Sequence, residues 1–145
     1  MNIELLIETA NFSDYDRDSG TGGFCAMFAL ALYRAVMDQN PELVLVCGEK
    51  NGQLLRNKKG EVYWRHAAAK VNGRYYDIEG EQQPEWMIDN YVWGLSSSDY
   101  EGVLAVFSPE EFIHEIRSTP SARDWRFYNK CKTKLERARS LLDRS

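Results

Sequence analysis

Residues 62–80 read VYWRHAAAKVNGRYYDIEG and predict a β-hairpin at the centre of the fold. Asn72-Gly73 stands between two segments rich in β-branched and aromatic residues, which is a strong signal for a two-residue turn. Residues equally distant from the turn face each other, so Asp77 is expected opposite Ala68, two residues beyond His66 and on its face. The hairpin alone therefore brings the Asp77 carboxylate within reach of the His66 imidazole.

Upstream of the hairpin, residues 24–40 read FCAMFALALYRAVMDQN and predict one long helix. The segment is rich in helix-forming residues, and its first turns are apolar almost all round. This pattern is typical of a central helix packed on several sides. The Asn40-Pro41 pair is expected to end it.

The remaining segments are assigned from their periodicity and turn residues. Residues 2–8 fit either a strand or a short helix, and residues 9–23 predict an irregular loop. The other predicted elements are a strand at 42–48, a polar hairpin or loop at 49–61, a helix at 84–95, a loop at 96–102, a strand at 103–107 and helices at 108–118 and 121–143. This order predicts a single α+β domain over 1–145, with the N-terminal helix packed on an antiparallel sheet and helices at the C-terminus.

Composition and charge exclude several classes of protein. The chain of 145 residues is 43% hydrophobic and 28% charged, as in ordinary globular domains. It has no apolar run long enough to span a membrane and no basic signal-peptide region, and its three cysteines are odd in number and far apart. We therefore expect a reducing, cytoplasmic setting and no membrane partner.

The net charge of −4 is unevenly distributed along the chain. Residues 121–145, the predicted basic amphipathic helix, carry eight Lys and Arg against three Asp and Glu. This helix can dock on the acidic remainder of the chain, and it can also contact an acidic partner or nucleic acid.

Cys25, His66 and Asp77 form the candidate catalytic set. A thiol nucleophile needs a base beside it and a third group that orients the base. Cys25 follows the glycine-rich SGTGG stretch and opens the predicted helix, where free N–H groups and the helix dipole favour negative charge. The Cys25 N–H can also donate to a developing oxyanion, and flexible glycines such as Gly23 allow a substrate to approach the backbone.

The order of these residues resembles the papain-like superfamily, especially its transglutaminase-like and small bacterial branches. The similar pattern there is H-x-x-x-x-V-x-G-x-x-Y-D, and this chain has HAAAKVNGRYYD. The resemblance covers about residues 19–80. It implies a nucleophile at Cys25, a base at His66, an orienting carboxylate at Asp77, and acyl transfer from a protein, peptide or small amide, an ester or a thioester.

The chain departs from that family around the nucleophile. GGFCAM is not the papain signature, and Ser19 stands at the usual position of the oxyanion glutamine. Asn11 and Thr21 are the other polar candidates there. The sequence predicts no cofactor and no metal site, because its histidines and cysteines lack ligand spacing. The alternative to catalysis is a non-catalytic binding or regulatory module on the same scaffold.

Overall fold

A computed structural model describes residues 1–21, 23–91, 100–116 and 120–144 of the chain. In chain order its helices are α1 (Ile3–Ala10), α2 (Asp14–Thr21), α3 (Cys25–Ala35), the 3-10 turn η1 (Met37–Gln39), α4 (Pro84–Tyr91), α5 (Pro109–Ile116) and α6 (Ala122–Asp143). Its strands are β1 (Glu42–Lys50), β2 (Gln53–Leu54), β3 (Trp64–Val71), β4 (Arg74–Asp77), β5 (Gly80–Gln82) and β6 (Glu101–Phe107). The α+β class and the antiparallel sheet are confirmed.

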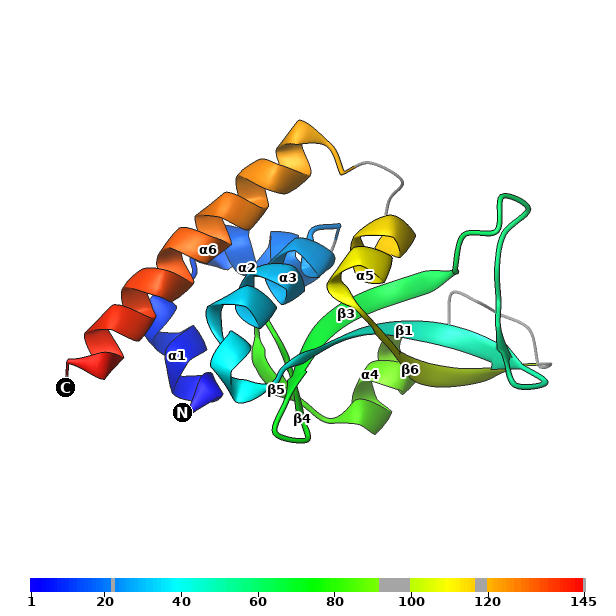
Figure 1. The fold of residues 1–145 in the computed structure, drawn as a ribbon, viewed down its shortest axis with the longest axis horizontal. Coiled ribbons are helices and arrows are strands. Elements are labelled where there is room, and N and C mark those ends of the chain that lie inside the picture. The colour runs from blue at the N-terminus through cyan, green and yellow to red at the C-terminus, as the bar shows by residue number, and fades with distance from the viewer. Residues whose placement is uncertain (22, 92–99, 117–119, 145) are drawn as a thin grey trace.

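The six strands form one open antiparallel sheet with β1 at its centre. β1 pairs with β3 on one side and with β6 on the other, and β3 continues through β4 to β5. α3 and α5 lie on one face of this sheet, α6 packs on α3 away from the sheet, and the short helix α4 lies on the other face (Figure 1). The main core lies between the sheet and α3.

The predicted hairpin is confirmed in turn and register. Asn72 and Gly73 both have positive φ values, of 52° and 80°, which is the left-handed geometry that this turn requires. Ala69 pairs with Tyr76, and the pairs run from there to the turn. The ladder stops before Asp77, which pairs instead with Gly80 in the next hairpin.

The central helix is confirmed but shorter than predicted. α3 ends at Ala35, a 3-10 turn follows, and Asn40 takes a left-handed φ of 51° just before Pro41. All eight residues of its first two turns, from Cys25 to Leu32, are buried. The helix is therefore enclosed on all sides at the end that carries Cys25.

The prediction of an irregular loop over residues 9–23 is wrong, because Asp14–Thr21 form α2. Ser13 begins this helix by accepting a hydrogen bond from the Asp16 N–H at 3.1 Å. Asp16 is buried and pairs with Lys130 of α6 at 2.6 Å and with Lys134 at 3.5 Å. Ion pairs with the distant helix α6 thus stabilise a segment in which apolar residues do not recur at helical spacing.

Capping residues account for the secondary structure of two further segments. Residues 2–8 belong to a helix, because Asn2 caps α1 through the Leu5 N–H. The predicted helix at 108–118 forms as α5, with Ser108 and Glu111 as the reciprocal cap. The ends of the predicted segments 84–95 and 108–118, and residues 96–99 of the predicted loop at 96–102, lie outside the described residues.

The C-terminal helix docks on the body of the chain, as its charge suggested. α6 packs along α3 and α1, with Tyr128, Cys131 and Leu135 buried at the contact. Arg139 forms a bidentate pair with Asp38 at 2.6 and 2.7 Å. Within the described ranges, no helix is both long and apolar enough to cross a membrane.

Candidate functional site

A buried hydrogen bond joins the two strand residues of the predicted set. Nε2 of His66 lies 2.9 Å from Oδ2 of Asp77, and the two side chains are 0% and 2% exposed. His66 is opposite Val46 of β1, on the face that α4 covers. The bond forms just beyond the last β3–β4 pair, where β4 turns toward β5.

Two further groups hold the Asp77 carboxylate in place. Its second oxygen, Oδ1, accepts the backbone N–H of Glu79 at 2.9 Å and the side-chain amide of Gln82 at 3.2 Å. With His66 on Oδ2, both carboxylate oxygens are bonded, so the anion is fixed in orientation. Sequence reasoning missed Gln82, although its place on the strand after Asp77 is a usable signal.

Tyr91, at the end of α4, covers the flat face of the imidazole. The two rings are stacked at 3.9 Å with an angle of 5° between their planes. Burial raises the pKa of Tyr91 to about 12, and the charges of Asp77 and Cys25 add to the effect. The tyrosine therefore stays neutral and shields the His66–Asp77 bond. The sequence placed Tyr91 in a helix but gave no sign of this contact.

The protonation of His66 depends on its neighbours Asp77 and Cys25. Burial lowers the pKa of His66, but hydrogen bonding and charge from Asp77 and Cys25 outweigh burial and raise it to about 9. The other ring nitrogen, Nδ1, is buried and has no partner in full hydrogen-bonding geometry. Because Nε2 is bonded to Asp77, Nδ1 is the ring nitrogen that remains for Cys25.

Cys25 is the first residue of α3, as predicted, and it is 2% exposed. The preceding Phe24 N–H donates to the Ser19 carbonyl at 3.0 Å, which ties the end of α2 to the start of α3. Gly23 is exposed, and a side-chain carbon added to it would meet nothing within 4 Å. The surface in front of the helix start is thus open at Gly23.

The other polar candidates have separate contacts. The Thr21 hydroxyl donates to the Arg17 carbonyl at 2.9 Å, and Asn11 ends α1 with a left-handed φ of 55°. Ser19 lines a depression between α2 and α6. The structure thus joins His66 to Asp77, and Cys25 acts on the same imidazole through hydrogen bonding and charge. Thr21, Asn11 and Ser19 have separate contacts.

No family model, curated protein or solved structure matches this chain.

The other two cysteines are buried and free. Burial raises the pKa of Cys47 to about 12, and it does the same for Cys131, so both remain thiols at neutral pH. Among the described residues, no cluster of three or more His, Cys, Asp or Glu side chains is placed to hold a metal ion.

Proposed function

We propose that this chain is a cysteine-dependent hydrolase or acyl transferase with a papain-like or transglutaminase-like core. The main support is the buried 2.9 Å bond that orients the His66 ring beside Cys25 at the start of α3. The order of a central helix followed by two antiparallel strands that carry the base and the carboxylate supports the same fold. The three free cysteines support a reducing compartment such as the cytoplasm.

The first half-reaction is acyl transfer to sulfur. A His66 ring whose pKa is near 9 carries a proton at neutral pH, and a cationic imidazole favours the thiolate form of an adjacent cysteine. The Cys25 sulfur attacks the carbonyl carbon of an amide, ester or thioester. His66 donates its proton to the leaving nitrogen, oxygen or sulfur, the bond to the leaving group breaks, and a thioester forms on Cys25.

The second half-reaction releases the acyl group. His66, now neutral, takes a proton from water or from an acceptor amine, alcohol or thiol. The acceptor attacks the thioester, the C–S bond breaks, and the Cys25 thiolate and the imidazolium are restored. Asp77 stabilises the cation throughout and fixes which ring nitrogen faces the sulfur.

The tetrahedral intermediates need donors for their oxyanion. The start of α3 supplies backbone N–H groups and the positive end of the helix dipole, and Cys25 is the first helical residue. Ser19 and Gly23 support this site through the backbone: Ser19 fixes the position of Phe24, and Gly23 leaves the approach open.

The experiment that tests this proposal is to trap the acyl-enzyme. The protein is mixed with p-nitrophenyl acetate and its intact mass is followed. We expect a gain of one acetyl group, mapped to Cys25 by peptide digestion, with release of p-nitrophenolate. The adduct should be absent in Cys25→Ala, slow to form in His66→Gln, and unchanged in Cys47→Ala, which serves as the matched control. Equal acetylation of wild type and Cys25→Ala would refute the proposal.

One observation favours a second candidate, a non-catalytic binding module on the same scaffold. Cys25 is 2% exposed, as expected for a cysteine that acts only as a small core residue. This candidate predicts that Cys25→Ala folds normally and keeps every activity that the wild type has. Catalysis predicts a folded but inactive variant.

A further inference from the structure

A depression lies next to the start of α3, between α2 and the first turns of α6, with a volume of about 230 Å³. It is lined by Tyr15, Ser19, Phe24, Arg123, Arg126, Phe127 and Lys130. We propose that this depression, called here the α2–α6 depression, binds a carboxylate side chain, Asp or Glu, of a peptide substrate. The proposal rests on the proposed function, since it names the substrate class of the same site.

The lining of the depression is cationic. It contains two arginines and a lysine and no acidic residue. Lys130 is already paired with the buried Asp16, but neither Arg123 nor Arg126 has a carboxylate within ion-pair distance in the described part of the chain. Two guanidinium groups are therefore available to an incoming anion, and guanidinium groups bind carboxylates in a bidentate way.

Aromatic rings form the apolar part of the depression. Phe24 and Phe127 are stacked with ring centroids 5.1 Å apart, and the Arg123 guanidinium lies 6.0 Å from the centre of the Phe24 ring. Tyr15 adds a third ring that is 75% exposed, which is unusual for so large a side chain. Such rings can cover the CH₂ groups of a bound side chain while the arginines contact its charge.

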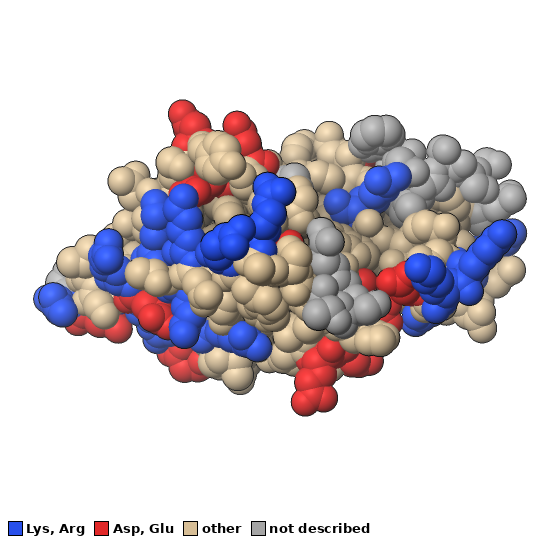
Figure 2. Space-filling model, turned by 90° about the horizontal axis from the view of Figure 1, so that it is seen from above, with Lys and Arg blue, Asp and Glu red and all other residues tan. Residues whose placement is uncertain are grey.

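Size and the surrounding charge favour a single anionic side chain over a long polyanion. Pockets for drug-sized ligands span about 300–1,000 Å³, so this depression fits a smaller group. Figure 2 shows Lys and Arg side chains gathered over one part of this face, with acidic side chains at their border. α2 itself carries Asp14 and Asp18 on its exposed surface, and the chain is negative overall. A nucleic acid crossing the depression would meet these charges.

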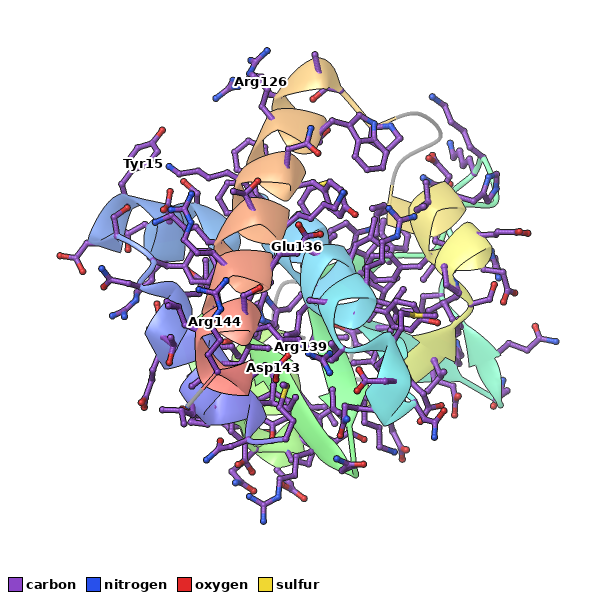
Figure 3. All side chains as sticks on the ribbon, turned by 60° about the vertical axis from the view of Figure 1, so that its left-hand side comes forward. Tyr15, Arg126, Glu136, Arg139, Asp143 and Arg144 are labelled. Atoms are coloured by element: carbon purple, nitrogen blue, oxygen red, sulfur yellow. The ribbon has the colours of Figure 1, made fainter. Side chains whose placement is uncertain are left out.

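The depression adjoins the segment that leads into the nucleophile. Phe24, part of its lining, directly precedes Cys25, so their Cα atoms are about 3.8 Å apart. The Ser19 carbonyl holds the Phe24 N–H, so the lining and the helix start are parts of one rigid segment. In Figure 3, Tyr15 and Arg126 project from α2 and the first turns of α6 at the same corner of the molecule. The lining of the depression therefore includes the residue directly before the proposed nucleophile.

The test measures binding without catalysis. Full-length Cys25→Ala protein is titrated with acetyl-Ala-Ala-Glu-Ala-Ala-amide and with its Gln counterpart, and NMR follows the Arg side-chain N–H and Tyr ring signals. We expect the Glu peptide to shift the Tyr15, Arg123 and Arg126 signals, and the Gln peptide to bind at least about fivefold more weakly. Adding Arg123→Gln and Arg126→Gln should remove the preference for Glu.

The matched control is Lys132→Gln with Arg144→Gln, which removes the same charge from α6 outside the depression and should leave the preference intact. Three results would overturn the proposal: equal binding of both peptides, equal loss in the control, or tighter binding of a short oligodeoxythymidylate at the same signals. Because Cys25→Ala lacks the nucleophile, this result is independent of acyl-enzyme trapping. Failure of the substrate class can therefore be told apart from failure of the chemistry.

Discussion

Replacing Asp77 by Asn should remove most of the dependence of stability on pH between pH 6 and pH 9. Asn keeps the size of the side chain and one oxygen for the Glu79 N–H, but it loses the charge that faces His66. Without that charge, burial is the main influence on the imidazole and lowers its pKa. The variant therefore holds a neutral His66 at pH 7, where the wild type holds a cation.

The size of the effect follows from the pKa of His66. The folded pKa of about 9 lies above the ordinary value of 6.5. A difference of one in pKa between the folded and unfolded states corresponds to about 1.4 kcal/mol. A raised pKa stabilises the folded state fully below pH 6.5, and this contribution is lost as pH rises through 9. The protonated pair should therefore add about 3 kcal/mol to the free energy of unfolding at pH 6 and almost nothing above pH 9.

The measurement is urea unfolding of wild type and Asp77→Asn at several pH values from 6 to 9, with NMR titration of the His66 ring in both. The wild type should be more stable at pH 6, and the difference should close toward pH 9. Asp38→Asn, which breaks an exposed ion pair with Arg139, is the control and should not change the slope in this range. A difference that stays constant with pH, or a wild-type His66 that titrates at or below 6.5, would refute the reasoning.

Three more predictions concern other parts of the structure. Iodoacetamide at neutral pH should modify Cys25 first and spare Cys47 and Cys131, because burial raises the pKa of each of those two thiols to about 12. Peptide mapping gives the order of modification, and equal rates at the three cysteines would count against an activated thiol. Asp16→Asn should lower the free energy of unfolding by about 2 kcal/mol, because the buried carboxylate pairs with two lysines of α6. In the same urea assay the control Asp18→Asn, at an exposed position, should change the free energy of unfolding by less than about 0.5 kcal/mol. Gly20→Ala should lower the free energy of unfolding by about 1–3 kcal/mol, since the added carbon would lie 2.8 Å from a buried isoleucine side chain. Gly23→Ala, where the added carbon would have nothing within 4 Å, should lower it much less, and equal losses of stability would contradict this packing.

The part of the site that the sequence predicts is the part fixed by local rules. The Asn72-Gly73 turn sets the register, and the alternation of side chains puts Asp77 on the face of His66. The apolar run after Phe24 predicts the helix that Cys25 begins. These inferences need only the turn type and the periods of strand and helix.

What the sequence does not predict depends on contacts between distant segments. α2 has only two buried residues and forms because Ser13 caps it and Lys130 pairs with its buried Asp16. Tyr91 stacks on His66 although 25 positions separate them in the sequence, because α4 crosses the outer face of the sheet. No local pattern around Asp16 or Tyr91 indicates either partner.

The β3–β4 ladder ends beside the candidate site, where α3 and the His66 side chain lie toward opposite faces of the sheet. His66 shares the α4 face with Ala68, whereas α3 packs on the opposite face against Ala67 and Ala69. A continuous pair of strands would separate the thiol from the ring. Because pairing stops at Ala69–Tyr76, the backbone beyond it is not closed by hydrogen bonds between the strands. Asp77 bonds to His66 just beyond this last pair, so the imidazole is held at the end of the ladder.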